Sequence, residues 1–72
     1  MQLGTRWNLG GEPPARLPED FVAAIRGVEA EVGEREWRWT LTWLEGRPIA
    51  DLDDGTRVRV GHDGSVVVEQ LD

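Results

Sequence analysis

The 72-residue chain contains no cysteine, no lysine and no tyrosine, and it lacks any long hydrophobic run. The absence of cysteine excludes disulfides and the zinc and redox sites that depend on thiolates. No apolar stretch approaches the roughly 20 residues that a membrane-spanning helix needs. The first six residues also lack the apolar region of a signal peptide. We therefore expect a cytoplasmic protein without a membrane partner.

Positive charge is scarce as well. The chain has 8 basic and 14 acidic side chains, which give it a net charge of −6. Nucleic acids and anionic membrane surfaces are bound through clustered positive charge. The charge balance therefore disfavours both, and we expect no nucleic acid among the partners.

The chain does contain enough apolar residues for one small core. Hydrophobic residues make up 39% of the sequence and include four tryptophans, which favours a folded domain over a disordered chain. Residues 17–72 carry the regular patterns and are predicted to form a single domain. Residues 1–16 are irregular and contain glycine and proline pairs. They are predicted to form an N-terminal arm, extended or partly ordered, with a candidate short strand at residues 5–9.

Residues 18–32 have the periodicity of a helix. Apolar side chains recur every three or four positions and form one stripe, which consists of Phe21, Ile25, Val28 and Val32. Pro18 suits the first helical position, and Gly33 suits the left-handed position that ends a helix. Gly27 in the helix interior costs roughly 1 kcal/mol relative to alanine. Its presence predicts a close approach between the helix and a neighbouring strand.

Residues 36–44 alternate with a period of two, which is typical of a strand with one buried face. Three more extended segments follow at residues 48–52, 56–60 and 65–70, each preceded by a glycine-containing turn. Short turns between neighbouring strands require antiparallel pairing. We therefore predict an α+β fold in which one α-helix packs on an antiparallel four-stranded β-meander. The order is α-β-β-β-β, with the candidate N-terminal strand as an addition.

The lengths of the turns determine the pairing register, because a one-residue slip moves every side chain to the opposite face. A two-residue turn at residues 45–46 and three-residue turns at both later positions keep one face apolar. On the opposite face this register sets Arg57 between the carboxylates of Asp51 and Glu69. The residues predicted on the apolar face are Trp37, Trp39, Leu41, Trp43, Ala50, Leu52, Val58, Val60, Val66 and Val68.

One helix is too narrow to cover this face. A helix with its side chains is about 10 Å wide, whereas four strands span roughly 14–19 Å. A soluble monomer rarely leaves several hundred Å² of apolar surface bare. The remaining cover has three candidates: the N-terminal arm through Trp7 and Leu9, a second copy of the chain, or a different partner.

Residues that could carry chemistry are few. His62, Asp63 and Ser65 nominally supply a catalytic triad, but positions within one tight turn cannot converge on a nucleophile. The segment Asp51–Gly55 resembles the start of a calcium-binding EF-hand loop, but its glycine comes one place early. Aspartate and glycine are typical of turns. We expect no catalytic residue, no metal site and no cofactor.

The shortage of cover and the lack of a catalytic set predict a non-enzymatic protein–protein interaction module. Such a module would form a homodimer or bind another protein through the tryptophan-rich sheet face. The residues expected at the interface are Trp7, Trp37, Trp43, Leu44 and Ile49.

Two other classes of function stay open. One is an acidic inhibitor or antitoxin-like decoy that binds a basic site on another protein through the glutamate-rich helix end. The residues of that surface are Glu29, Glu31, Glu34 and Glu36. The other class is an enzyme or small-ligand binder with a pocket between the helix and the sheet.

Overall fold

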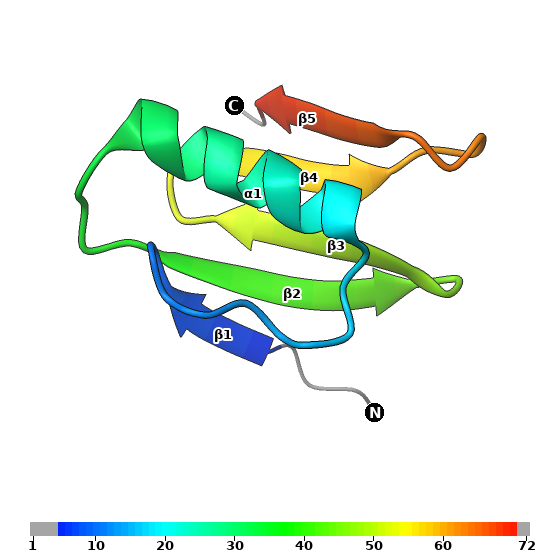
Figure 1. The fold of residues 1–72 in the computed structure, drawn as a ribbon, viewed down its shortest axis with the longest axis horizontal. Helices are drawn as coiled ribbons and strands as arrows, with labels where there is room; N and C mark the ends of the chain where they lie inside the picture. The colour runs from blue at the N-terminus through cyan, green and yellow to red at the C-terminus, as the bar shows by residue number, and fades with distance from the viewer. Residues whose placement is uncertain (1–4, 71–72) are drawn as a thin grey trace.

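The computed structural model describes residues 5–70 and places one helix on one face of a five-stranded antiparallel sheet (Figure 1). Neighbouring strands follow one another in the chain, so the sheet is a meander. The predicted α+β fold is confirmed, and the candidate N-terminal strand joins the sheet as its first member. The elements are β1 (Thr5–Asn8), α1 (Glu19–Val32), β2 (Arg38–Leu44), β3 (Arg47–Leu52), β4 (Thr56–Val60) and β5 (Val66–Gln70).

The predicted register is confirmed at every pairing that the turns determine. Leu41 faces Ala50, Ala50 faces Val58, and Val58 faces Val68. In the two-residue turn between β2 and β3, both residues have positive φ, 53° at Glu45 and 77° at Gly46. This geometry matches the right-handed twist of the flanking strands. The two later turns span three residues, 53–55 and 62–64, and each ends on a glycine with positive φ.

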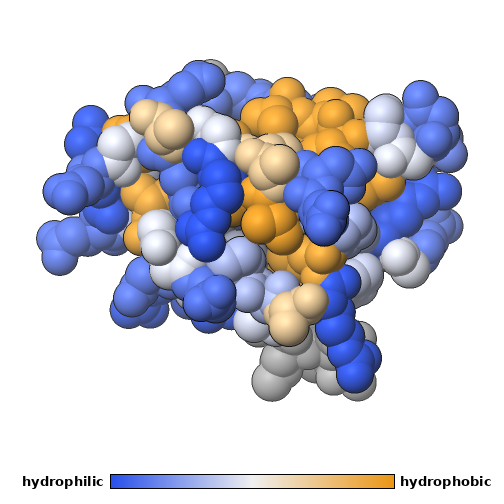
Figure 2. Space-filling view, viewed as in Figure 1, coloured by the Kyte–Doolittle hydropathy of each residue, from blue (hydrophilic) through white to orange (hydrophobic). Residues whose placement is uncertain are grey.

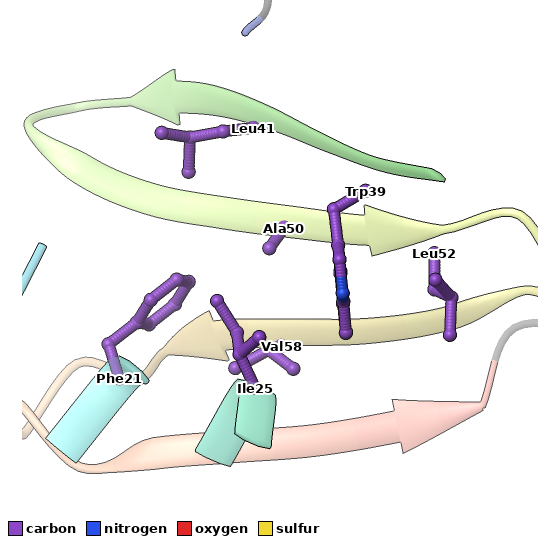
Figure 3. Packing of buried hydrophobic residues seen from close by; sticks show 7 residues of the cluster. All are labelled: Phe21, Ile25, Trp39, Leu41, Ala50, Leu52 and Val58. Carbon is purple, nitrogen blue, oxygen red and sulfur yellow. The ribbon is translucent and has the colours of Figure 1, made fainter. Parts of the chain in front are cut away.

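The core lies between α1 and the middle of the sheet. Trp39 is fully buried and extends from β2 across β3 toward β4, while Phe21 and Ile25 point from α1 toward the sheet (Figure 3). These side chains pack into one cluster between the helix and the sheet. The seven buried hydrophobic residues are Phe21, Ile25, Trp39, Leu41, Ala50, Leu52 and Val58.

The N-terminal arm supplies cover that the helix cannot. Strand β1 pairs with β2, and the Trp7 ring stacks on the Trp39 ring with their centroids 6.2 Å apart and their planes 18° from parallel. Leu9 and Leu17 also pack against the core. Apolar surface nevertheless remains visible beside the helix, most extensively toward β5 (Figure 2). Trp43 is 42% exposed and Val68 is 50% exposed.

The ends of α1 differ slightly from the prediction. Pro18 has an extended backbone, with φ −60° and ψ 151°, and it precedes the first helical residue, Glu19. Its carbonyl accepts the amide of Val22 at 3.0 Å, so Pro18 caps the helix instead of occupying the first turn. Gly33 ends the helix as predicted, with φ 78° and its amide donating to the carbonyl of Glu29.

The prediction that Gly27 allows close approach to a strand is wrong. Gly27 is exposed, and a Cβ atom added there would meet no other atom within 4 Å. The residue lies on the solvent side of α1, away from the stripe that contacts the sheet. Its cost in helix propensity is therefore not offset by packing.

Replacing Gly27 with alanine should stabilise the protein. Alanine restricts the unfolded chain and fits the helix without a clash, so the free energy of unfolding should rise by roughly 0.5–1 kcal/mol. Urea denaturation followed by tryptophan fluorescence measures the change. Gly33→Ala is the matched control, and it should destabilise because its φ of 78° is strained for alanine. A loss of stability in Gly27→Ala would contradict this account of α1.

Candidate interaction surface

The end of the β2–β3 hairpin carries exposed apolar side chains on both faces of the sheet. We call this surface the hairpin end and define it by Trp43, Leu44 and Ile49. Neighbouring residues in a strand point to opposite faces, so Trp43 lies on the helix face while Leu44 lies on the open face. Leu44 is 61% exposed and Ile49 is half-buried.

On the helix face, Trp43 forms one wall of a groove of about 850 Å³ between β2 and the N-terminal arm. The segment before α1 lines it with Pro14, Ala15, Arg16 and Leu17. The groove therefore combines a flat indole with aliphatic surface and one positive charge. The lining residues that matter most are Pro14, Arg16, Leu17, Leu41 and Trp43.

On the open face, Leu44 and Ile49 border a smaller groove of about 210 Å³. Glu45, Arg47 and Arg59 also line it, so aliphatic surface lies beside charges of both signs, and Arg59 is paired with Glu69. The two grooves lie on opposite sides of the same hairpin. A partner that binds the hairpin end would therefore contact Trp43 on the helix face, or Leu44 and Ile49 on the open face.

The other two residues predicted at the interface lie away from the hairpin end. Trp7 is half-buried against Trp39, and its Nε1 is buried without a hydrogen-bond partner among residues 5–70. Trp37 is half-buried at the opposite end of β2, with the Arg35 guanidinium 5.8 Å from its ring centroid. The structure therefore brings together Trp43, Leu44 and Ile49, and it separates Trp7 and Trp37 from them.

Glu29 has a structural role that the sequence does not suggest. Its side chain is only 10% exposed. Its carboxylate accepts the amide of Gly10 at 2.9 Å, the indole Nε1 of Trp39 at 3.0 Å and the guanidinium of Arg26 at 3.0 Å. Those donors come from the arm, the sheet and the helix. Glu29 thus holds three parts of the fold together, and little of it is available to a partner.

The remaining acidic residues of the helix end stay free for contact. Glu31, Glu34 and Glu36 are all exposed. The last turn of α1 contains no basic residue, so the negative end of the helix dipole adds to these charges. The acidic surface is smaller than the sequence alone predicts, and the exposed Arg35 lies between Glu34 and Glu36 in the chain.

The turn at residues 62–64 and the residue after it contain His62, Asp63 and Ser65, the three residue types of a catalytic triad. His62 is the only histidine in the sequence. Asp63 Oδ1 accepts both the hydroxyl of Ser65 at 2.7 Å and the Ser65 amide at 3.1 Å. These bonds lower the pKa of the Asp63 carboxyl, with the hydroxyl as the larger cause. His62 is exposed, and among residues 5–70 no hydrogen bond joins it to Ser65. Ser65 and Asp63 therefore stabilise a turn.

The aspartates of the EF-hand-like segment bind backbone amides and a cross-strand arginine. Asp53 accepts the amide of Arg38 and Asp54 accepts the amide of Thr56, each at 2.9 Å. Asp51 binds Arg57 Nε at 2.7 Å, and this hydrogen bond raises the pKa of the Arg57 guanidinium. Within residues 5–70, no three His, Asp or Glu side chains gather as metal ligands.

The predicted position of Arg57 between two carboxylates is confirmed, since Arg57 lies opposite Asp51 on β3 and opposite Glu69 on β5. Arg57 binds Asp51, whereas Glu69 reaches diagonally to Arg59, with Nε and Oε2 2.9 Å apart. Each arginine thereby has its own carboxylate partner.

The chain has no match among models of protein families, curated proteins or solved structures. Among the described residues, no helix has the length and apolar character that crossing a membrane requires.

Removing the Glu29 carboxylate should destabilise the protein. Glu29→Ala leaves the indole N–H of Trp39 and the amide of Gly10 without an acceptor, which should cost about 2–4 kcal/mol of unfolding free energy. Glu29→Gln keeps one carbonyl oxygen for those donors and loses mainly the half-exposed ion pair with Arg26, so its cost should be well under half as large. Urea denaturation measures both values. Equal losses in the two variants would contradict the account in which Glu29 stabilises the fold mainly as a hydrogen-bond acceptor.

The Asp63 carboxyl should titrate below the ordinary aspartate value of about 3.9. Because its pKa is lowered in the folded state, its contribution to stability is present at neutral pH and is lost as the pH falls through that pKa. A ¹³C NMR titration of the carboxyl carbon measures the midpoint. Ser65→Ala should raise it while the backbone bond from residue 65 remains. A midpoint that is unchanged by this substitution would disprove the assigned cause.

Proposed function

We propose that this chain is a non-enzymatic protein–protein interaction module that binds a partner through the hairpin end. The observation that carries the proposal is Trp43, which is 42% exposed in the wall of a groove. A large indole left in water is unfavourable, since covering it would gain free energy in proportion to its apolar area. An exposed tryptophan beside a concave surface is typical of a binding site.

The chemistry around Trp43 supports a protein partner. Tryptophan and arginine are the residues most enriched among those that dominate binding energy at protein interfaces. Arg16 and Trp43 line the same groove, with Pro14 and Leu17 as apolar surface between the strand and the arm. A segment with a bulky apolar side chain next to a carboxylate would fit this combination, because the carboxylate could pair with Arg16.

The rest of the described surface offers less support for catalysis. Asp63 and Ser65 bind each other in an exposed turn, and Asp51 is engaged by an arginine. The carboxylates of Asp53 and Asp54 accept backbone amides. The carboxylates of Asp51, Asp53, Asp54 and Asp63 thus each have a structural partner of their own. An interaction in the cytoplasm is the role that we propose.

The alternative is an acidic decoy that binds a basic site on another protein. It rests on Glu31, Glu34 and Glu36, which are exposed at a helix end that lacks basic residues. Glu29 is not part of this surface, because its carboxylate accepts hydrogen bonds from Gly10 and Trp39 within the fold. Binding of this kind would weaken steeply as salt rises, whereas burial of Trp43 would respond little to salt.

Photo-crosslinking tests the proposal in cells. A benzophenone amino acid at position 43 should capture a partner in good yield, while the same group at position 34 should not. Trp43→Ser in the unmodified chain should abolish binding of the captured partner, measured with purified proteins by calorimetry. Its unfolding free energy should fall by less than about 1 kcal/mol, in contrast to the roughly 3–5 kcal/mol expected for Trp39→Ala in the core.

Three outcomes would count against this reading. Capture only from position 34, with salt-sensitive binding, would favour the acidic decoy. Capture from neither position would remove both surfaces as partner sites. If Trp43→Ser unfolds the protein as severely as Trp39→Ala does, then Trp43 belongs to the core and its exposed part is not a binding surface.

A further inference from the structure

Strand β5 forms one edge of the sheet, and its outer side is open. The strand order places β5 at the end of the sheet, and Figure 1 shows α1 lying over the sheet without shielding that edge. Among residues 5–70, no strand pairs with this side of β5. Proteins usually protect such edges with proline, lysine or a bulge, because an open edge pairs with other chains. The sequence of β5, Val-Val-Val-Glu-Gln, contains no proline or lysine.

The pairing of β4 with β5 determines which backbone groups face outward. The amide of Gly61 donates to the carbonyl of Ser65 at 2.7 Å, so this is a hydrogen-bonded position of the ladder. Hydrogen-bonded and non-hydrogen-bonded positions alternate along an antiparallel pair. Val67 and Glu69 therefore direct their backbone groups toward β4. The N–H and C=O groups that point away from the sheet belong to Val66, Val68 and Gln70.

We propose that β5 pairs with β5 of a second copy of this chain, antiparallel and with the two-fold axis at Val68. Val68 then faces Val68 of the second copy, and Val66 faces Gln70 of the second copy. All three outward-facing residues fall on hydrogen-bonded positions in this register. Two hydrogen bonds at each such position give roughly six main-chain bonds between the copies. The two sheets become one continuous sheet.

The side chains fit the same register. Val68 is 50% exposed on the helix face, and the pairing covers it with its own equivalent. Glu69 faces Val67 of the second copy rather than another Glu69, so like charges are not brought opposite each other. Its carboxylate is also held by Arg59 at 2.9 Å. Although the chain has a net charge of −6, this register therefore does not place the two Glu69 carboxylates opposite each other, and each is neutralised by its own Arg59.

The proposal commits to a second copy because a two-fold pairing is self-complementary at Val68. The other edge strand, β1, has four residues, and joining it to β5 would give a head-to-tail contact without the two-fold symmetry that limits assembly to a dimer. The β5 edge is distinct from the hairpin end. The dimer therefore does not depend on the function proposed above, and the two can be tested separately.

Sedimentation equilibrium and amide hydrogen exchange test the dimer with the whole chain. The wild type should reach twice the 8.1 kDa chain mass as its concentration rises. In the dimer the amides of Val66, Val68 and Gln70 should exchange slowly, and dilution should restore fast exchange at these three positions. Val67 and Glu69 should exchange slowly in monomer and dimer alike. Because this pattern is measured on the wild type, it does not depend on how any variant folds.

A pair of charge substitutions locates the interface. Val68→Arg places two cations opposite each other at the axis, so the dimer should be lost while circular dichroism still shows the folded domain. Leu44→Arg is the matched control, with an exposed aliphatic residue replaced at the hairpin end, and it should leave the dimer intact. A wild type that stays monomeric into the millimolar range overturns the proposal. So does a dimer lost in Leu44→Arg but not in Val68→Arg, or growth beyond a dimer, which would indicate head-to-tail joining.

Discussion

The carboxylate of Glu29 joins the helix, the sheet and the N-terminal arm at one point. It accepts hydrogen bonds from the arm at Gly10 and from the core indole of Trp39, while Arg26 of the same helix neutralises its charge. A charge that is nearly buried must be fully paired, because an unsatisfied one costs several kcal/mol. The pairing therefore fixes where α1 lies over the sheet. It also fixes where the arm crosses the end of the helix.

That arrangement decides which tryptophans are covered. With the arm held in place, Trp7 stacks on Trp39, and the centre of the apolar face is closed without a partner. The arm and the helix do not extend over the whole face, so exposure is left at two places. One is Trp43 at the hairpin end, and the other is Val68 at the β5 edge. The centre of the core is thus covered within one molecule, while Trp43 and Val68 stay exposed at its margins, where other molecules can make contact.

Much of this fold could be predicted from the sequence. Alternation along residues 36–44 and the three glycine-containing turns determine the strands and their register, because backbone geometry alone specifies them. The role of Glu29 could not be predicted, since it depends on where a helix lies across a sheet and on an arm 19 residues away in the chain. The diagonal pairing of Glu69 with Arg59 depends on side-chain rotamers rather than on register. The exposure of Trp43 and Leu44 at the end of a strand pair could be predicted from the sequence, whereas the placement of Trp7 and Trp37 away from them could not.

The two three-residue turns share one construction. In each, an aspartate followed by glycine accepts the amide two positions ahead, Asp54 from Thr56 and Asp63 from Ser65. The hairpins that they close involve only contacts between residues close in the chain, which form quickly during folding. The arm must instead close a loop of about thirty residues to pair β1 with β2. Sequence separation therefore favours assembly of the meander before the arm docks. Because the Trp7 ring stacks on that of Trp39, docking of the arm is the step that completes the cover of the core indole.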